Sequence, residues 1–142
     1  MPHDHTETIR SFFQSFARRD DKALTEALDP QIEWTSAENF LYADHSPYIG
    51  IDAVRQLLVD RLHNDWENIS ATAGEILGGG DLVIANGRFR GTFKANGASI
   101  NAQFVQVFQF KDGKIAKCQM YTDTAQFKES IAKIRSVGVE SA

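Results

Sequence analysis

The chain has 142 residues, 42% of them hydrophobic, and a formal net charge of −4, which is typical of one folded domain and excludes an intrinsically disordered chain. The lysines and arginines are spread along the sequence, so we expect no nucleic-acid partner, and no apolar run reaches the roughly 20 residues that cross a bilayer, so we expect no membrane partner. The single Cys118 excludes an internal disulfide, and the polar N-terminus lacks the apolar region of a signal peptide. We therefore expect a cytoplasmic protein.

The first 35 residues predict two helices and a strand. In residues 4–20, apolar side chains recur at helical spacing, at Ile9, Phe12, Phe13 and Phe16. A second helix over residues 21–28 must end near Asp29, because Pro30 disfavours helical geometry in the residue before it. Residues 31–35 then alternate between apolar and polar side chains and predict a half-buried strand, with Ile32 and Trp34 on one face.

The rest of the chain predicts a long loop, a helix, a run of strands and a closing helix. The loop covers residues 36–50 and the helix residues 51–62. Hairpin signals such as Asn96-Gly97 join the strands, which we place at residues 70–77, 82–93, 98–110 and 115–122. Gly87 and Gly91 lie inside a strand and favour a bend there. The closing helix is expected over residues 124–134.

This order of elements predicts one α+β domain over residues 1–142, with tails at residues 1–5 and 136–142. The strands form a curved antiparallel sheet, and the helices pack across its concave face. Ten phenylalanines, three tyrosines and two tryptophans are many for this length, so the core, or a cavity in it, should be aromatic. The inside of such a cone is a natural pocket for a small molecule.

Four stretches in this order resemble a known family. They are the helix that ends in "ARRD", then "ALDPQIEW", "SPYIGIDAVRQLL" and "VFQFKDGKIAKCQMYTDTAQF". Together they are similar to the SnoaL-like and ketosteroid isomerase-like group of the nuclear transport factor two-like superfamily, over nearly the whole chain. The resemblance implies a cone-shaped, cystatin-like α+β barrel and a homodimer formed through the open sheet face. It implies no single activity, because the superfamily holds isomerases, cyclases, hydrolases, dehydratases and binding domains.

The resemblance also locates positions where this chain departs from two known chemistries. A ketosteroid isomerase uses an aspartate base and a tyrosine donor; at the corresponding positions the first strand has Trp34 and the first helix has Phe12. A limonene epoxide hydrolase pairs an Arg-x-Asp motif on a middle strand with an aspartate at the end of the last strand. Asp123 matches that aspartate, but residues 82–93 contain no Arg-x-Asp motif.

Asp123 is therefore the candidate catalytic residue, with two alternatives left open. Strand alternation puts Gln119, Tyr121 and Asp123 on one face. If that face lines the cone, burial raises the pKa of Asp123 and suits it to acid/base catalysis. Alternatively, Asp123 caps the closing helix. The expected ligand-binding residues are Trp34, Phe12, Phe16, Tyr121, Gln119, Phe104, Phe108 and His45.

His45 belongs to the loop over residues 36–49, which either closes over the mouth of the pocket or leaves His45 in solvent. Apart from His3 and His5, no residues have the spacing of metal ligands, and we find no phosphate-binding loop or dinucleotide motif, so we expect no metal and no cofactor. The sequence predicts a SnoaL-like protein that binds a small apolar organic molecule, as an isomerase, cyclase or hydrolase with Asp123 as acid/base. The alternative is a non-catalytic ligand-binding or dimeric interaction module.

Overall fold

The computed structural model describes the backbone of residues 5–141 and the side chains of residues 5–132. Helices precede, interrupt and follow a run of long strands. In chain order the elements are α1 (His5–Ala17), α2 (Asp21–Glu26), β1 (Leu28–Thr35), the 3-10 turn η1 (Ala43–His45), β2 (Tyr48–Ile49), α3 (Ile51–Arg55), the π-helical segment η2 (Gln56–Arg61), α4 (Leu62–Asp65), β3 (Trp66–Gly79), β4 (Leu82–Phe93), β5 (Ser99–Lys111), β6 (Lys114–Thr122) and α5 (Thr124–Ser141).

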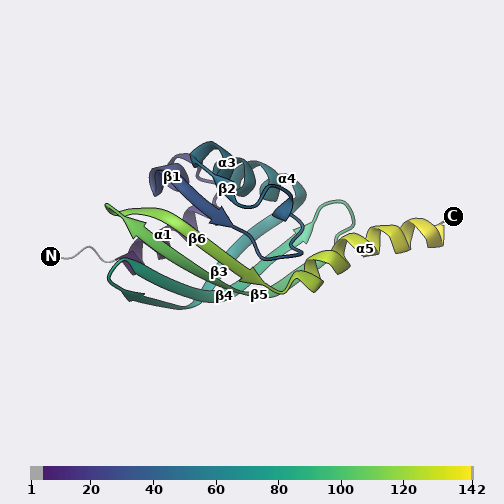
Figure 1. The fold of residues 1–142 in the computed structure, drawn as a ribbon. Coiled ribbons are helices and arrows are strands. Elements are labelled where there is room, and N and C mark those ends of the chain that lie inside the picture. Colours follow the sequence, from purple (N-terminus) through teal and green to yellow (C-terminus); the bar gives the residue numbers. More distant parts are fainter. Residues whose placement is uncertain (1–4, 142) are drawn as a thin grey trace.

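The six strands form one curved sheet in the order β2-β1-β6-β5-β4-β3, which confirms the predicted α+β class. The helices α3 and α4 lie over one side of the sheet, and α5 leads away from the end of β6 (Figure 1). Helix α1 packs on the same concave face, mainly against β3. No strand pairing among the described residues joins β2 to β3, so the sheet is not closed into a barrel.

One strand pair corrects the predicted antiparallel sheet. β1 and β6 run parallel, with Trp34 opposite Cys118 and Thr35 opposite Gln119, whereas the other neighbouring strands are antiparallel. Hairpin signals in a sequence report only on strands that follow one another. Since β1 and β6 are separated by most of the chain, no turn between them reveals how they pair.

Two element boundaries also differ from the sequence prediction. Helix α2 ends at Glu26 rather than near Asp29, and β1 already begins at Leu28, because Leu28 pairs with Ile115 of β6. Strand β3 begins at Trp66 instead of residue 70. A register shift between Glu67 and Ser70 interrupts the alternating pattern there, which hid the start of the strand.

The described parts of the two predicted tails belong to helices. Residues 1–4 and 142 lie outside the described residues, so a tail there stays a prediction. His5 was expected in the tail, but it begins α1, and its ring stacks on Phe110 with 4.2 Å between ring centroids. The backbone of α5 is helical up to Ser141, which covers most of the tail expected at residues 136–142.

Close contact between β3 and β4 explains the glycines inside β4. A Cβ atom added to Gly87 would lie 2.0 Å from the backbone oxygen of Thr72, and the register of β3 shifts between Ala73 and Glu75, directly beside it. A bulge of this kind increases the local twist and bends the strand. Gly87 is therefore needed where the sheet curves around the space beneath α1.

Gly87→Ala should destabilise the fold by about 1–3 kcal/mol, because the added methyl group must push one strand away from the other. Gly79→Ala is the matched control in the neighbouring strand, since a Cβ atom there would have no neighbour within 4 Å. Urea unfolding of both variants measures the free energies. Equal stability of the two variants would contradict the close contact between Gly87 and the backbone of Thr72.

Candidate functional site

A cavity of about 40 Å³ lies between the helices and the concave face of the sheet. Its walls come from α1, β1, the loop that follows β1, the continuous helix over residues 51–65, β3, β4, β5, β6 and the first turn of α5. Aromatic rings dominate the lining, namely Phe12, Phe13, Phe16, Trp34, Phe40, Phe89 and Phe127. Aliphatic side chains complete it, at Leu57, Leu58, Leu62, Ile69, Ala71 and Met120, together with the polar Ser36 and Gln106. We call this space the aromatic cavity.

Tilted and edge-to-face contacts between rings hold one end of the aromatic cavity. The centroid of Phe12 lies 6.0 Å from that of Trp34, and both rings approach Phe108 at 6.4 and 6.2 Å. Such tilted arrangements are favourable for aromatic rings and add to the gain from burial. They also fix the ring planes, so this wall of the cavity is stiff.

The polar residues of the lining, Ser36 and Gln106, are almost fully buried, with 5% and 4% of their surfaces exposed. The Oγ atom of Ser36 and the Oε1 atom of Gln106 have no hydrogen-bond partner among the described residues. A buried polar atom without a partner costs about 1–3 kcal/mol. The sheet would be more stable with apolar side chains here, so the two groups are candidates for binding something that enters the cavity.

The sheet register brings Ser36 and Gln106 to either side of Met120. Thr35 pairs with Gln119 of β6, and the next residue of β6, Met120, pairs with Gln106 of β5. Ser36 follows Thr35 directly. Since neighbouring strands are about 4.8 Å apart, the two polar groups are separated by one strand.

The helix beside the cavity contains a π-helical segment, η2. Its residues Leu57 and Leu58 both line the aromatic cavity. A π-helical segment widens the helix and shifts the side chains that follow it, and such segments are frequent at functional sites. Here it lets two consecutive leucines contribute to one wall.

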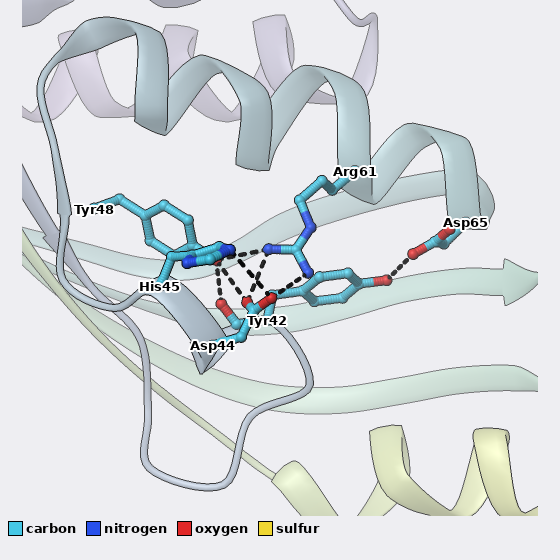
Figure 2. Close-up of polar contacts among 6 residues, drawn as sticks. All are labelled: Tyr42, Asp44, His45, Tyr48, Arg61 and Asp65. Carbon is cyan, nitrogen blue, oxygen red and sulfur yellow. Dashed lines mark hydrogen bonds and ion pairs between the residues drawn. The ribbon is translucent and has the colours of Figure 1, made fainter.

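The loop between β1 and α3 is attached to this helix by a network of polar contacts (Figure 2). Arg61 donates two hydrogen bonds to the carboxylate of Asp44, at 2.9 and 3.0 Å, and a third to the hydroxyl of Tyr48 at 2.9 Å. Tyr42 donates to Asp65 at 2.7 Å and accepts from the indole nitrogen of Trp66 at 2.9 Å. We call these contacts the loop latch.

The loop latch matters to the cavity because the same loop supplies two of its lining residues, Ser36 and Phe40. The Arg61 guanidinium lowers the pKa of Asp44 to about 2. This carboxylate is therefore charged at neutral pH and forms an ion pair with Arg61. Burial raises the pKa of Tyr42, which keeps its hydroxyl protonated and able to donate to Asp65. Both effects favour a loop that stays fixed over the cavity.

Comparison with known proteins gives the family. Residues 9–118 match the family model described as "SnoaL-like domain". The chain belongs to the SnoaL-like domain family. No curated protein matches it.

Solved structures agree with this SnoaL-like fold. An NTF2-like protein from Burkholderia thailandensis is 25% identical, with a TM-score of 0.82 and coverage of 92% of this chain and 98% of the other. A putative SnoaL-like polyketide cyclase from Jannaschia sp. is 15% identical, with a TM-score of 0.78 and coverage of 92% and 94%. A hypothetical protein from Catenulispora acidiphila with a ketosteroid isomerase-like fold, in complex with trimethylamine, is 15% identical, with a TM-score of 0.70 and coverage of 81% and 84%.

The described part of this SnoaL-like domain has no helix that is long and apolar enough to cross a membrane. It also has no group of three or more histidine, cysteine, aspartate or glutamate side chains arranged to hold a metal ion.

Some of the residues that we predicted as ligand-binding do line the aromatic cavity. Phe12, Phe16 and Trp34 belong to its wall. Phe104 and Phe108 are buried beside the lining rather than in it: Phe104 stacks on Phe89 at 4.4 Å, and Phe108 packs behind Phe12 and Trp34.

The placement of Gln119, Tyr121 and Asp123 in the cone is wrong. On β6 it is the alternate set, Cys118 and Met120, that is buried, whereas Tyr121 is 55% exposed. Burial of the more apolar set is favoured by the transfer of apolar surface from water. Tyr121 and Asp123 instead line an open groove on the outer face of the sheet, together with Arg88.

Asp123 lies at the junction of β6 and α5, in the position that precedes the helix. Its carboxylate accepts a hydrogen bond from the side chain of Gln126 at 3.0 Å, and its backbone N–H donates to Gln103 at 3.2 Å. Neither contact is the bond from a backbone N–H of the first helical turn that defines a cap, so the capping alternative also stays a prediction. An acid/base role for Asp123 stays a prediction, but it does not act from the aromatic cavity.

His45 is also outside the cavity. Its side chain is 75% exposed and lies 3.7 Å from Asp44.

Two residues that line the cavity, Ser36 and Gln106, were not predicted from the sequence. Gln106 had a signal, because it alternates with Phe104 and Phe108 on the buried face of β5. Ser36 had none, because it begins a loop without periodicity.

Asp44→Asn should weaken the loop latch and lower the free energy of unfolding by about 0.5–1 kcal/mol at pH 7, as for a well-formed surface ion pair. The pKa of Asp44 is about 2 in the folded protein against an ordinary value of 3.8. Its stabilisation is therefore complete above about pH 4 and is lost as the pH falls towards 2. Urea unfolding at pH 7, 4 and 3 should show the difference between wild type and variant shrinking.

Glu38→Gln, in the same loop, is the control and should not reproduce this pH dependence. A difference between wild type and Asp44→Asn that stays constant from pH 7 to pH 3 would contradict a charged Asp44–Arg61 contact.

Proposed function

We propose that this SnoaL-like domain binds a small, neutral and largely apolar organic molecule in the aromatic cavity. The observation that carries the proposal is the lining itself. Seven aromatic rings and six aliphatic side chains surround the space, with no ionisable side chain among the lining residues. Ligand sites are typically of this kind, mostly apolar with a few polar groups that set orientation.

The absence of charge in the lining favours binding over acid/base chemistry. A general acid or base must lie within hydrogen-bond reach of the proton that it transfers. The ionisable groups of the loop latch, Asp44, Arg61 and Asp65, contact one another or Tyr42 and Tyr48. The geometry therefore supports a binding protein more than an isomerase, cyclase or hydrolase.

The size of the cavity limits the ligand. A water molecule needs about 10–15 Å³ of such space, so 40 Å³ corresponds to roughly three waters. A larger ligand requires the lining to move, and Met120 is suited to this because its side chain has several rotatable bonds. A C. acidiphila protein of the same fold, in complex with trimethylamine, supports a small ligand; because trimethylamine is mostly a cation at neutral pH, it does not bear on the neutral character proposed here.

A second candidate keeps Asp123 as an acid/base, acting in the outer groove. The observation that favours it is the presence of Arg88 and Tyr121 in the lining of the same groove. Turnover of a substrate there would be lost in Asp123→Asn, whereas binding in the aromatic cavity would not change. The two proposals are therefore separable in one variant.

We also propose that the domain forms a homodimer through the outer sheet face. Its support is a group of exposed apolar side chains on neighbouring strands, at Leu77, Leu82, Ile84, Val105 and Tyr121. Exposed apolar patches often mark interaction sites. Light scattering at micromolar concentration should give twice the chain mass for wild type and the single chain mass for Val105→Lys. A wild-type protein with the mass of one chain would contradict the dimer.

A cytoplasmic location is likewise a proposal. It is supported by Cys118, a single, free and buried cysteine, because reducing compartments do not select for disulfides.

Ala71→Val should fill the aromatic cavity and weaken binding of small apolar probes by at least tenfold. Ala71 lies on β3 with its methyl group in the lining, and valine suits a strand, so the fold should persist. Thiophene and benzothiophene are suitable probes, titrated while the melting temperature and the tryptophan fluorescence, to which Trp34 and Trp66 both contribute, are measured.

Thr72→Val is the matched control, because Thr72 is the next residue and points to the exposed face. It should bind the probes like wild type. The proposal fails if no probe binds the wild-type protein, or if Ala71→Val and Thr72→Val bind equally well.

A further inference from the structure

The aromatic cavity is apolar except at Ser36 and Gln106, and this exception restricts the ligand. Both side chains are buried at the wall, and both have an oxygen without a hydrogen-bond partner among the described residues. Ser36 is held in place by its backbone N–H, which donates to the hydroxyl of Ser46 at 2.9 Å. Its own hydroxyl has no partner among the described residues, and Ser36 belongs to the lining of the cavity.

We propose that the natural ligand carries a neutral hydrogen-bond donor, a hydroxyl or a ring N–H, on an otherwise apolar body, and that this donor binds Gln106 with Ser36 beside it. This rests on the proposed function and narrows its ligand class. The amide oxygen of Gln106 can only accept a hydrogen bond, so its partner must donate. The Ser36 hydroxyl can donate or accept and suits a group that does both, such as a hydroxyl.

Charged ligands do not fit this arrangement. The lining has no ionisable side chain to pair with a charge, and burying an unpaired charge costs far more than a neutral hydrogen bond returns. A ligand without any polar group fits the body of the cavity but leaves the Gln106 oxygen unpaired. A site with a buried polar group binds a ligand that pairs with this group more tightly than a similar ligand that leaves it unpaired.

Three ring compounds of similar shape separate these cases. Pyrrole donates a hydrogen bond through its N–H, furan only accepts through its oxygen, and thiophene does neither to a useful extent. Indole, benzofuran and benzothiophene form the same series in a larger size. The affinity of each for the full chain is measured by titration with NMR detection.

The wild-type protein should bind pyrrole, or indole in the larger series, roughly tenfold more tightly than the other two members, as one buried hydrogen bond implies. In Gln106→Met, which keeps the length of the side chain but has no amide, this preference should disappear, so that the three members of a series bind with similar affinity. Ser36→Ala should reduce the preference, and urea unfolding confirms that each variant is folded.

The outcomes are distinguishable. Equal binding of the three members of a series by wild type would overturn the donor requirement and leave the proposed function intact, with water serving the polar groups. Preference for furan or benzofuran would also overturn it, because the site would then donate. If none of the six compounds binds, the proposed function fails and this inference fails with it.

Discussion

The contact between the phenylalanines of α1 and the concave face of the sheet is the constraint on which the rest of the structure depends. Phe13 packs edge-on against Phe104 and Phe108, at 5.7 and 6.1 Å between centroids, and Phe12 packs against Trp34. Aromatic rings are large and rigid and prefer tilted contacts at such distances. They bury much apolar surface, but they cannot collapse into every gap as aliphatic side chains do. The aromatic cavity is the space that remains.

Curvature of the sheet is the second requirement for that space. Gly87 allows β3 and β4 to approach each other at the shift of register, and such a bulge bends the sheet. The loop latch then supplies the remaining wall, since Arg61 and Asp44 hold the loop that carries Ser36 and Phe40. The rigid parts of the site thus come from ring packing and charge pairing, whereas Leu57, Leu58 and Met120 form its adaptable part.

The sequence predicts the helices and strands in which apolar residues recur with a clear period. It does not predict how distant segments pair with one another. Phe12, Phe16 and Trp34 were placed in the cavity because helical and strand spacing report directly on the buried face. The parallel pairing of β1 with β6 could not be predicted, because it joins distant segments. The face of Asp123 was predicted wrongly because a polar set was assumed to line the cone, whereas the Cys118 and Met120 set is more apolar and is buried. In the sequence, Gln106 is recognisable only as a polar residue at a position where the alternating pattern predicts an apolar one. Its lack of a hydrogen-bond partner depends on the packing of distant segments and can be seen only in the structure.

The most direct test of the account is the position of a bound probe, read from the methyl group of Met120. The chain contains two methionines, Met1 and Met120, so ¹³C labelling of methionine methyl groups gives a spectrum of two signals. When indole or benzothiophene is added, the account predicts a shift of the Met120 signal and nuclear Overhauser contacts between its methyl group and the ring protons. A Met120 signal that stays unchanged at probe concentrations where titration shows binding would contradict it.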